Sequence, residues 1–165
     1  MSERQTAFRR IMIKQSEKNS MPADTYDLNR FLKAQEQSYD AALKEISQGH
    51  KRSHWIWYIF PQMKGLGISS MSDYYGIGSL EEARAFLKDP VLGEHLRKIT
   101  EALLSLSSDD ASEIFGYPDD LKVRSSMTLF GEADPENLLF PKVLKKFYGG
   151  VKDARTLDIL SERMK

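Results

Sequence analysis

The sequence predicts a mainly α-helical protein, a single compact globular domain of seven to eight short and medium helices. Three observations predict this all-α class. Apolar residues recur with helical spacing, capping residues precede those segments and glycines follow them, and no Asn-Gly or Asp-Gly hairpin or sustained period-two alternation appears. The length of 165 residues suits one domain. We place this helical domain at residues 27–165 and interpret residues 1–26 as an N-terminal extension.

The first strong helix is predicted between Asp27, the expected N-cap, and Gly49, the expected stop. Its apolar stripe comprises Leu28, Phe31, Leu32, Gln35, Tyr39, Ala42, Leu43 and Ile46. The next segment, WIWYIF at residues 55–60, has the aromatic and β-branched composition of a strand. Because no partner strand is evident, we expect a short buried helix that ends at Pro61.

Capping signals define the later helices. Ser79 and Glu82 have the spacing of a capping box, before a helix that runs to about Lys88. The remaining helices are expected to open at Asp89-Pro90, at Ser108-Asp109-Asp110, at Pro118 and at Asp134-Pro135, with stops near Gly116, Gly131 and Gly149-Gly150 and a last helix around residues 157–160. The sequence shows no repeat and no second domain.

Composition excludes several function classes. The 24 basic residues balance the 24 acidic ones, which argues against nucleic acid or a membrane surface as partner. The longest apolar run, six residues, is far below the roughly 20 needed to span a bilayer. Without cysteine there is no disulfide or thiolate site, and we expect a cytoplasmic location. The three histidines lack paired spacing, so no metal site and no cofactor are predicted, and His50 and His95 are expected at the surface.

The stretch from His50 to Gly67, HKRSHWIWYIFPQMKGLG, is the strongest candidate for a site. Aromatic rings with polar edges, neighbouring cations and two glycines are typical of a small-molecule pocket. His54 is the candidate acid or base, because its ordinary pKa lies near neutrality. The candidate ligand-binding residues are Gln35, Lys51, Trp55, Trp57, Gln62, Lys64, Tyr74, Lys122, Arg124 and Ser125. The alternative is that the rings fill the core and that His54 closes a loop through a backbone hydrogen bond.

Two of these choices have separate reasons. The segment from Lys122 to Thr128 offers two cations and three hydroxyls that suit a phosphate or carboxylate, although a solvated helix face would have the same composition. Gln35 lies on an apolar helix face, so it either braces a loop or points at a ligand. Asp119 and Asp120 are a weaker hypothesis for general-base carboxylates, because a helix N-terminus also favours acidic residues.

Several strings in order resemble one bacterial family. They are SHWIWYIFPQMKGLG, YYGI, SLEEARAFL, DPVLGEHL, IFGYPDDLKVRSSMTLF and TLDIL, over roughly residues 27–161. The sequence resembles the domain-of-unknown-function family 1810, whose members sometimes carry the label calpastatin. That label has no physical basis here, because calpastatin is largely disordered and this chain reads as a compact globule. The resemblance implies a single, mainly helical domain and no established activity. A more distant resemblance to helical proteins that process NAD- or ADP-ribose-derived compounds is an analogy of fold.

Three functions follow as expectations. The first is binding or processing of a small, flat anion of nucleotide or ADP-ribose type in the aromatic and cationic segment. The second is a non-catalytic interaction module or homo-oligomer that uses the same segment as its interface. The third, nucleic-acid binding through Arg9, Arg10, Lys14 and the Lys51-Arg52 pair, is opposed by the balanced charge.

Overall fold

The computed structural model describes residues 25–163, so residues 1–24 and 164–165 lie outside it. Most of the predicted N-terminal extension, with Arg9, Arg10 and Lys14, is therefore outside the described residues. Within residues 25–163 the chain forms nine helices and no sheet, which confirms the mainly α-helical class and adds at least one helix to the seven or eight expected. The helices are α2 (Asn29–Ser47), α3 (Ile56–Ile59), α4 (Ser70–Tyr74), α5 (Leu80–Lys88), α6 (Leu92–Leu104), α7 (Ala111–Phe115), α8 (Asp119–Ala133), α9 (Leu139–Tyr148) and α10 (Ala154–Arg163).

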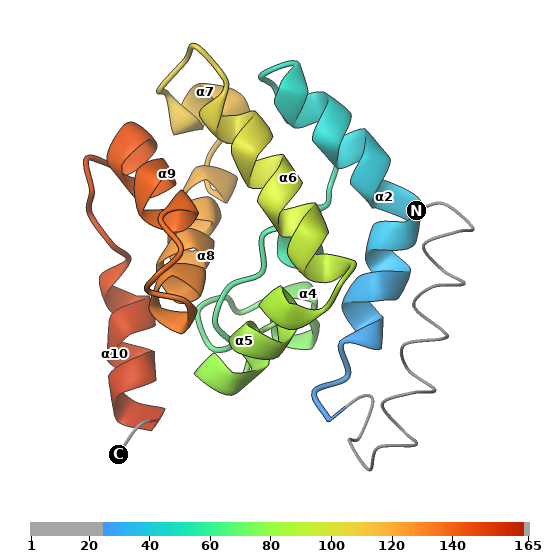
Figure 1. The fold of residues 1–165 in the computed structure, drawn as a ribbon, viewed down its shortest axis with the longest axis vertical. Helices are drawn as coiled ribbons and strands as arrows, with labels where there is room; N and C mark the ends of the chain where they lie inside the picture. Colours follow the sequence, from blue (N-terminus) through green and yellow to red (C-terminus); the bar gives the residue numbers. More distant parts are fainter. Residues whose placement is uncertain (1–24, 164–165) are drawn as a thin grey trace.

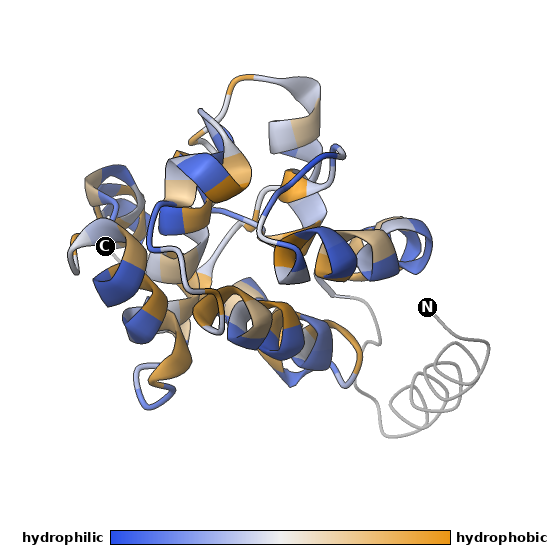
Figure 2. Ribbon diagram, turned by 90° about the horizontal axis from the view of Figure 1, so that it is seen from above, coloured by the Kyte–Doolittle hydropathy of each residue, from blue (hydrophilic) through white to orange (hydrophobic). Residues whose placement is uncertain are grey.

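Two helices organise the packing. Helix α6 packs against α2, α5 and α9, and α8 packs against α5, α7, α9 and α10. Figure 1 shows α6 running diagonally between α2 on one side and α9 on the other. Phenylalanine rings connect these helices. The ring centroid of Phe86 in α5 lies 5.1 Å from that of Phe31 in α2 and 5.3 Å from that of Phe130 in α8. Phe130 in turn lies 5.8 Å from Phe140 of α9. Figure 2 shows apolar and polar residues side by side on the longer helices, and α8 differs from the others because an unbroken run of its residues, 125–130, is buried.

Most capping predictions are confirmed. The Ser79 hydroxyl accepts a hydrogen bond from the Glu82 backbone N–H at 3.1 Å, and the Asp110 carboxylate accepts one from the first turn of α7. The Asp89 carboxylate accepts from the backbone N–H groups that open α6. Gly149 ends α9 with φ of 60°, in the left-handed region where glycine costs least.

The predicted start of the first helix is wrong. Asp27 has φ of 51° and does not cap α2, whose flanking residue is Leu28 and which has no side-chain cap. The Arg30 guanidinium donates to the Asp27 and Tyr26 carbonyl oxygens at 2.7 Å each. Arg30 therefore fixes the carbonyl oxygens before α2, whereas the N–H groups that an Asp cap would have bound receive no side-chain cap.

Other boundaries differ for local reasons. Helix α4 was not predicted, because its large apolar residues, Met71 and Tyr74, are exposed and make no buried stripe. Helix α9 begins at Leu139 instead of Asp134-Pro135, since the Asn137 side chain accepts a hydrogen bond from the Leu139 N–H at 3.0 Å.

The expectation that His95 is exposed is also wrong. Its side chain is buried, at 4% exposure, and its ring stacks on Tyr39 with centroids 3.6 Å apart. The Nδ1–H donates to the Gln35 amide oxygen at 2.8 Å, and the Gln35 amide nitrogen donates to the Tyr58 carbonyl at 2.7 Å. Position 95 shares a helix face with Leu92 and Ile99, which the apolar spacing alone would have placed inside.

The WIWYIF segment is a short helix, as predicted. Helix α3 covers Ile56–Ile59, and Trp55 and Phe60 on either side of it are buried. After it, a lone parallel bridge joins Met63 to Ile77. No helix among residues 25–163 combines the length and apolar character needed to cross a membrane.

Candidate functional site

Two lysine–tryptophan pairs share one carboxylate. The Lys51 ammonium lies 5.0 Å from the Trp55 ring centroid, and the Lys122 ammonium lies 5.5 Å from the Trp57 ring centroid. Lys51 also lies 2.9 Å from Asp119 Oδ2, while Lys122 lies 3.5 Å from Asp119 Oδ1. We call these five residues the lysine–tryptophan cluster. Attraction between a cation and an aromatic face and between opposite charges both favour this arrangement.

Three segments position the cluster. Trp55 and Trp57 belong to the start of α3, Lys51 to the preceding loop, and Asp119 and Lys122 to the first turn of α8. The loop is fixed to α7, because the Lys51 backbone N–H donates to the Ile114 carbonyl at 2.7 Å.

Glu45 near the end of α2 holds the same loop from the other side. Its Oε1 accepts hydrogen bonds from the backbone N–H groups of Arg52 and Ser53 and from the Trp55 indole at 3.0 Å. Its Oε2 accepts one from the Ser53 hydroxyl. Burial by itself would raise the pKa of this carboxyl, but the four hydrogen bonds to the charged form outweigh it and lower the pKa to about 2.

The two pairs differ in access. Trp55 lies in the core and the Lys51 side chain is only 7% exposed, so this inner pair is part of the interior. The outer pair is reachable, because Trp57 is half-buried and the side chains of Lys122 and Asp119 are 25% and 20% exposed. The Trp57 indole N–H is buried without a hydrogen-bond partner among the described residues. The five residues carry two ammonium groups and one carboxylate, a net formal charge of +1, and the charged Glu45 carboxylate lies next to them on the Trp55 indole.

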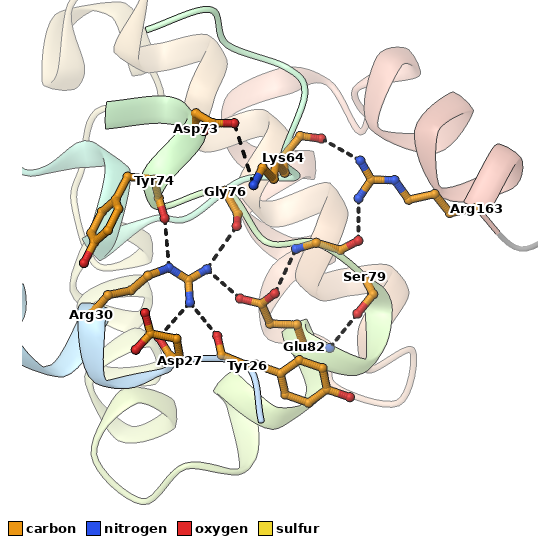
Figure 3. Close-up of polar contacts among 11 residues, drawn as sticks. Tyr26, Asp27, Arg30, Lys64, Asp73, Tyr74, Gly76, Ser79, Glu82 and Arg163 are labelled. Carbon is orange, nitrogen blue, oxygen red and sulfur yellow. Dashed lines mark hydrogen bonds and ion pairs between the residues drawn. The ribbon is translucent and has the colours of Figure 1, made fainter. Parts of the chain in front are cut away.

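A second polar network surrounds Arg30, and no sequence pattern predicts it. Figure 3 shows the Arg30 guanidinium between the carbonyl oxygens of Tyr74 and Gly76 and the carboxylate of Glu82. The Arg30–Glu82 pair, at 2.7 Å, is nearly buried on both sides, with side-chain exposures of 8% and 9%. The network ties α2 to the loop before α5, so its role is to support the fold.

Lys64 and Tyr74 belong to this loop and not to the lysine–tryptophan cluster. The Lys64 ammonium lies 3.7 Å from exposed Asp73, and Tyr74 projects into solvent (Figure 3). Arg163 of α10 donates to the carbonyl oxygens of Lys64 and Gly78. A Cβ added at Gly76 would lie 2.7 Å from the Lys64 Cα, so only glycine fits the bridge at this point.

The other predicted residues lie in separate environments. Gln35 is buried, and its amide nitrogen donates to the Tyr58 carbonyl, so it braces the short helix α3 instead of a loop. The Ser125 hydroxyl donates to the Leu121 carbonyl, and Arg124 lies 3.7 Å from the Asp153 carboxylate. Gln62 is half-buried. His54 is exposed, and within the described residues only its backbone carbonyl accepts a hydrogen bond.

Four of the eleven predicted residues therefore come together: Lys51, Trp55, Trp57 and Lys122. Asp119, which joins them, was considered only as a weak general-base hypothesis. Two hollows of about 340 and 310 Å³ are lined entirely by other residues. Among residues 25–163 no group of three or more acidic or histidine side chains could hold a metal ion.

Comparisons with known proteins agree on the fold and give no activity. A family model described as "Protein of unknown function (DUF1810)" matches residues 25–160. The crystal structure of a conserved hypothetical protein from Mycobacterium tuberculosis superposes with a TM-score of 0.82 at 46% sequence identity, over 84% of this chain and 99% of that one. No curated protein matches the chain significantly.

Proposed function

Because the chain belongs to the DUF1810 family, whose description assigns no activity, we propose a function from the lysine–tryptophan cluster. The cluster binds a small ligand that combines an anionic group with a flat ring, of nucleotide or ADP-ribose type. The supporting observation is that Lys51 and Lys122 lie on the two oxygens of one Asp119 carboxylate while each also lies against a tryptophan.

The chemistry of the outer pair carries the proposal. Asp119 is shared between two ammonium groups, so it cannot fully neutralise both, and Lys122 keeps charge available for a phosphate or carboxylate. The Trp57 ring beside it offers an apolar surface for a planar group, and its indole N–H has no hydrogen-bond partner among residues 25–163. The inner pair holds this arrangement rigid, which lowers the cost of ordering the site when a ligand binds.

Calorimetric titration with ADP, ADP-ribose, adenosine and inorganic phosphate tests the proposal. We expect ADP or ADP-ribose to bind, and adenosine and phosphate alone to bind more weakly because each offers half of the required chemistry. Lys122→Gln should weaken binding by about tenfold or more, since a hydrogen bond to a charged group is lost. Lys142→Gln, at an exposed lysine of α9, is the matched control.

His54 is tested separately. It is exposed and outside the cluster's contacts, so His54→Ala should leave the binding constant unchanged and affect only a proton-transfer step. If no compound of a broad nucleotide panel shifts the melting temperature of the native protein, the nucleotide assignment is withdrawn. A cytoplasmic location belongs to the same proposal, because a chain without cysteine suits a reducing compartment.

Exposed apolar residues favour a second candidate, self-association. In the aromatic segment expected to form this interface Trp55 and Phe60 are buried, but Ile68, Met71 and Tyr74, which follow it, are all exposed. Met71 and Tyr74 are three residues apart on α4 and so share a face. Light scattering across protein concentration separates the candidates: a strict monomer at all concentrations would exclude self-association and leave the ligand proposal untouched.

A further inference from the structure

A hollow of about 310 Å³ lies between the start of α5 and the end of α10, away from the lysine–tryptophan cluster. Its apolar lining comes from Met63, Leu80 and Leu160, and its charged lining from Glu81, Arg84 and Arg163. The volume is at the lower end of the range typical of small-molecule sites, about 300–1,000 Å³. The hollow therefore has room for one compact ligand.

The floor of the hollow is fixed. Met63 and Leu160 are almost fully buried, so they present only a limited apolar surface to the hollow. Met63 is held by its bridge to Ile77, in which the Ile77 N–H donates to the Gln62 carbonyl and the Lys64 N–H donates to the Ile77 carbonyl. A ligand would meet this surface without first ordering it.

Backbone oxygens hold the two arginines in place. Arg84 Nε donates to the Ala133 carbonyl at 3.1 Å, and Arg163 donates to the Gly78 and Lys64 carbonyls (Figure 3 shows Arg163). Carbonyl oxygens orient a guanidinium without cancelling its charge. The carboxylate paired with Arg84 is Glu81, at the long distance of 3.9 Å and on an exposed side chain, so this pair is weak. Two preorganised cations thus flank an apolar floor.

The charge of the lining selects the ligand class. Arg84 and Arg163 contribute +2 and Glu81 contributes −1, which leaves +1. We propose that this hollow binds a monocarboxylate with a compact apolar body: the body rests on Met63, Leu80 and Leu160, and the carboxylate accepts hydrogen bonds from the remaining guanidinium N–H groups. The proposal uses residues outside the lysine–tryptophan cluster, so the two proposals stand or fall separately.

The test is a titration of the ¹⁵N-labelled full chain with 3-phenylpropionate, followed by amide chemical shifts. We expect saturable shifts at millimolar concentration that concentrate on residues 79–84 and 159–163. The uncharged analogue 3-phenylpropionamide should bind about tenfold more weakly, because it cannot form charge-assisted hydrogen bonds with the arginines. Acetate, which lacks the apolar body, should also bind more weakly.

Variants supply the second arm. Arg84→Gln should weaken binding of 3-phenylpropionate by about tenfold, whereas Arg155→Gln, at an exposed arginine of α10 outside the hollow, should have no effect. If Arg84→Gln does not fold, the acid–amide comparison on the native chain decides. Equal affinity for acid and amide, shifts centred elsewhere, or no saturation at millimolar concentration would overturn the proposal.

Discussion

Acidification should destabilise this protein through His95 as the pH falls from about 6.5 towards 4. Burial lowers the pKa of this imidazole from 6.5 to about 4. The neighbouring charges of Asp40 and Glu94 favour the protonated ring and Lys98 opposes it, but burial outweighs them. The folded state therefore keeps the ring neutral under conditions in which the unfolded chain protonates it.

The sign and size follow from proton linkage. The unfolded chain binds the proton first, so stability is fully present above pH 6.5 and is lost as the pH falls towards 4. The separation of the two pKa values corresponds to a total loss of about 3–4 kcal/mol, because each pKa unit is worth about 1.4 kcal/mol. Most of this loss should have occurred by about pH 4.5.

The assay is urea denaturation at a series of pH values, followed by tryptophan fluorescence, since Trp55 is buried in the native state. His95→Gln is the matched variant. It loses the ring stacking on Tyr39, so it should be less stable throughout, but its stability should stay nearly flat between pH 6.5 and 4.5. Parallel pH profiles for the native protein and His95→Gln would refute the reasoning, whereas His54→Ala should follow the native profile.

Three further predictions concern the supports of the two loops. Glu45→Gln should lower the free energy of unfolding by about 1–3 kcal/mol, measured by urea denaturation at neutral pH, and should remove the stability loss expected between pH 4.5 and about 2. Gly76→Ala should lower the free energy of unfolding by about 1–3 kcal/mol, because the new Cβ would lie 2.7 Å from backbone. Gly131→Ala inside α8 should raise it by about 0.5–1 kcal/mol, because its Cβ would have ordinary contacts at 3.8 Å. A melting temperature higher for Gly76→Ala than for Gly131→Ala would contradict this. Arg30→Gln should cost about 3–5 kcal/mol, since the Glu82 charge stays buried without an opposite charge and keeps only its hydrogen bond from the Gly78 N–H, and a change within error would show that the pair is dispensable.

Local signals predicted much of the fold. The capping residues Ser79 and Asp110 bind N–H groups only three residues away, and Gly149 ends its helix by its own backbone angle. In each case a few consecutive residues contain both partners of the interaction, so the sequence pattern predicts it. The short helix α3 was predictable for a different reason: a strand needs a partner, and none was visible.

Contacts between distant residues account for the partners of Arg30 and His95 that the sequence did not indicate. Arg30 reaches carbonyl groups 44 and 46 residues away, and His95 finds its partner Gln35 60 residues away, so neither pairing leaves a pattern in the neighbouring sequence. The candidate site shows the same division. The lysines and tryptophans stand out in the sequence by residue type. The Asp119 carboxylate pairs with both lysines only when α8 is folded against the loop before α3.

The attachment of the loop at residues 64–78 has an evolutionary consequence. Arg30 and Arg163 donate hydrogen bonds to main-chain oxygens, which every amino acid possesses. These bonds therefore do not depend on which side chains the loop carries. The amino acids at exposed positions such as Ile68 and Met71 can therefore change in evolution, or be randomised in a library, while the backbone of the loop keeps its path. Relatives sharing both arginines and Gly76 would be expected to present new surfaces here on an unchanged frame.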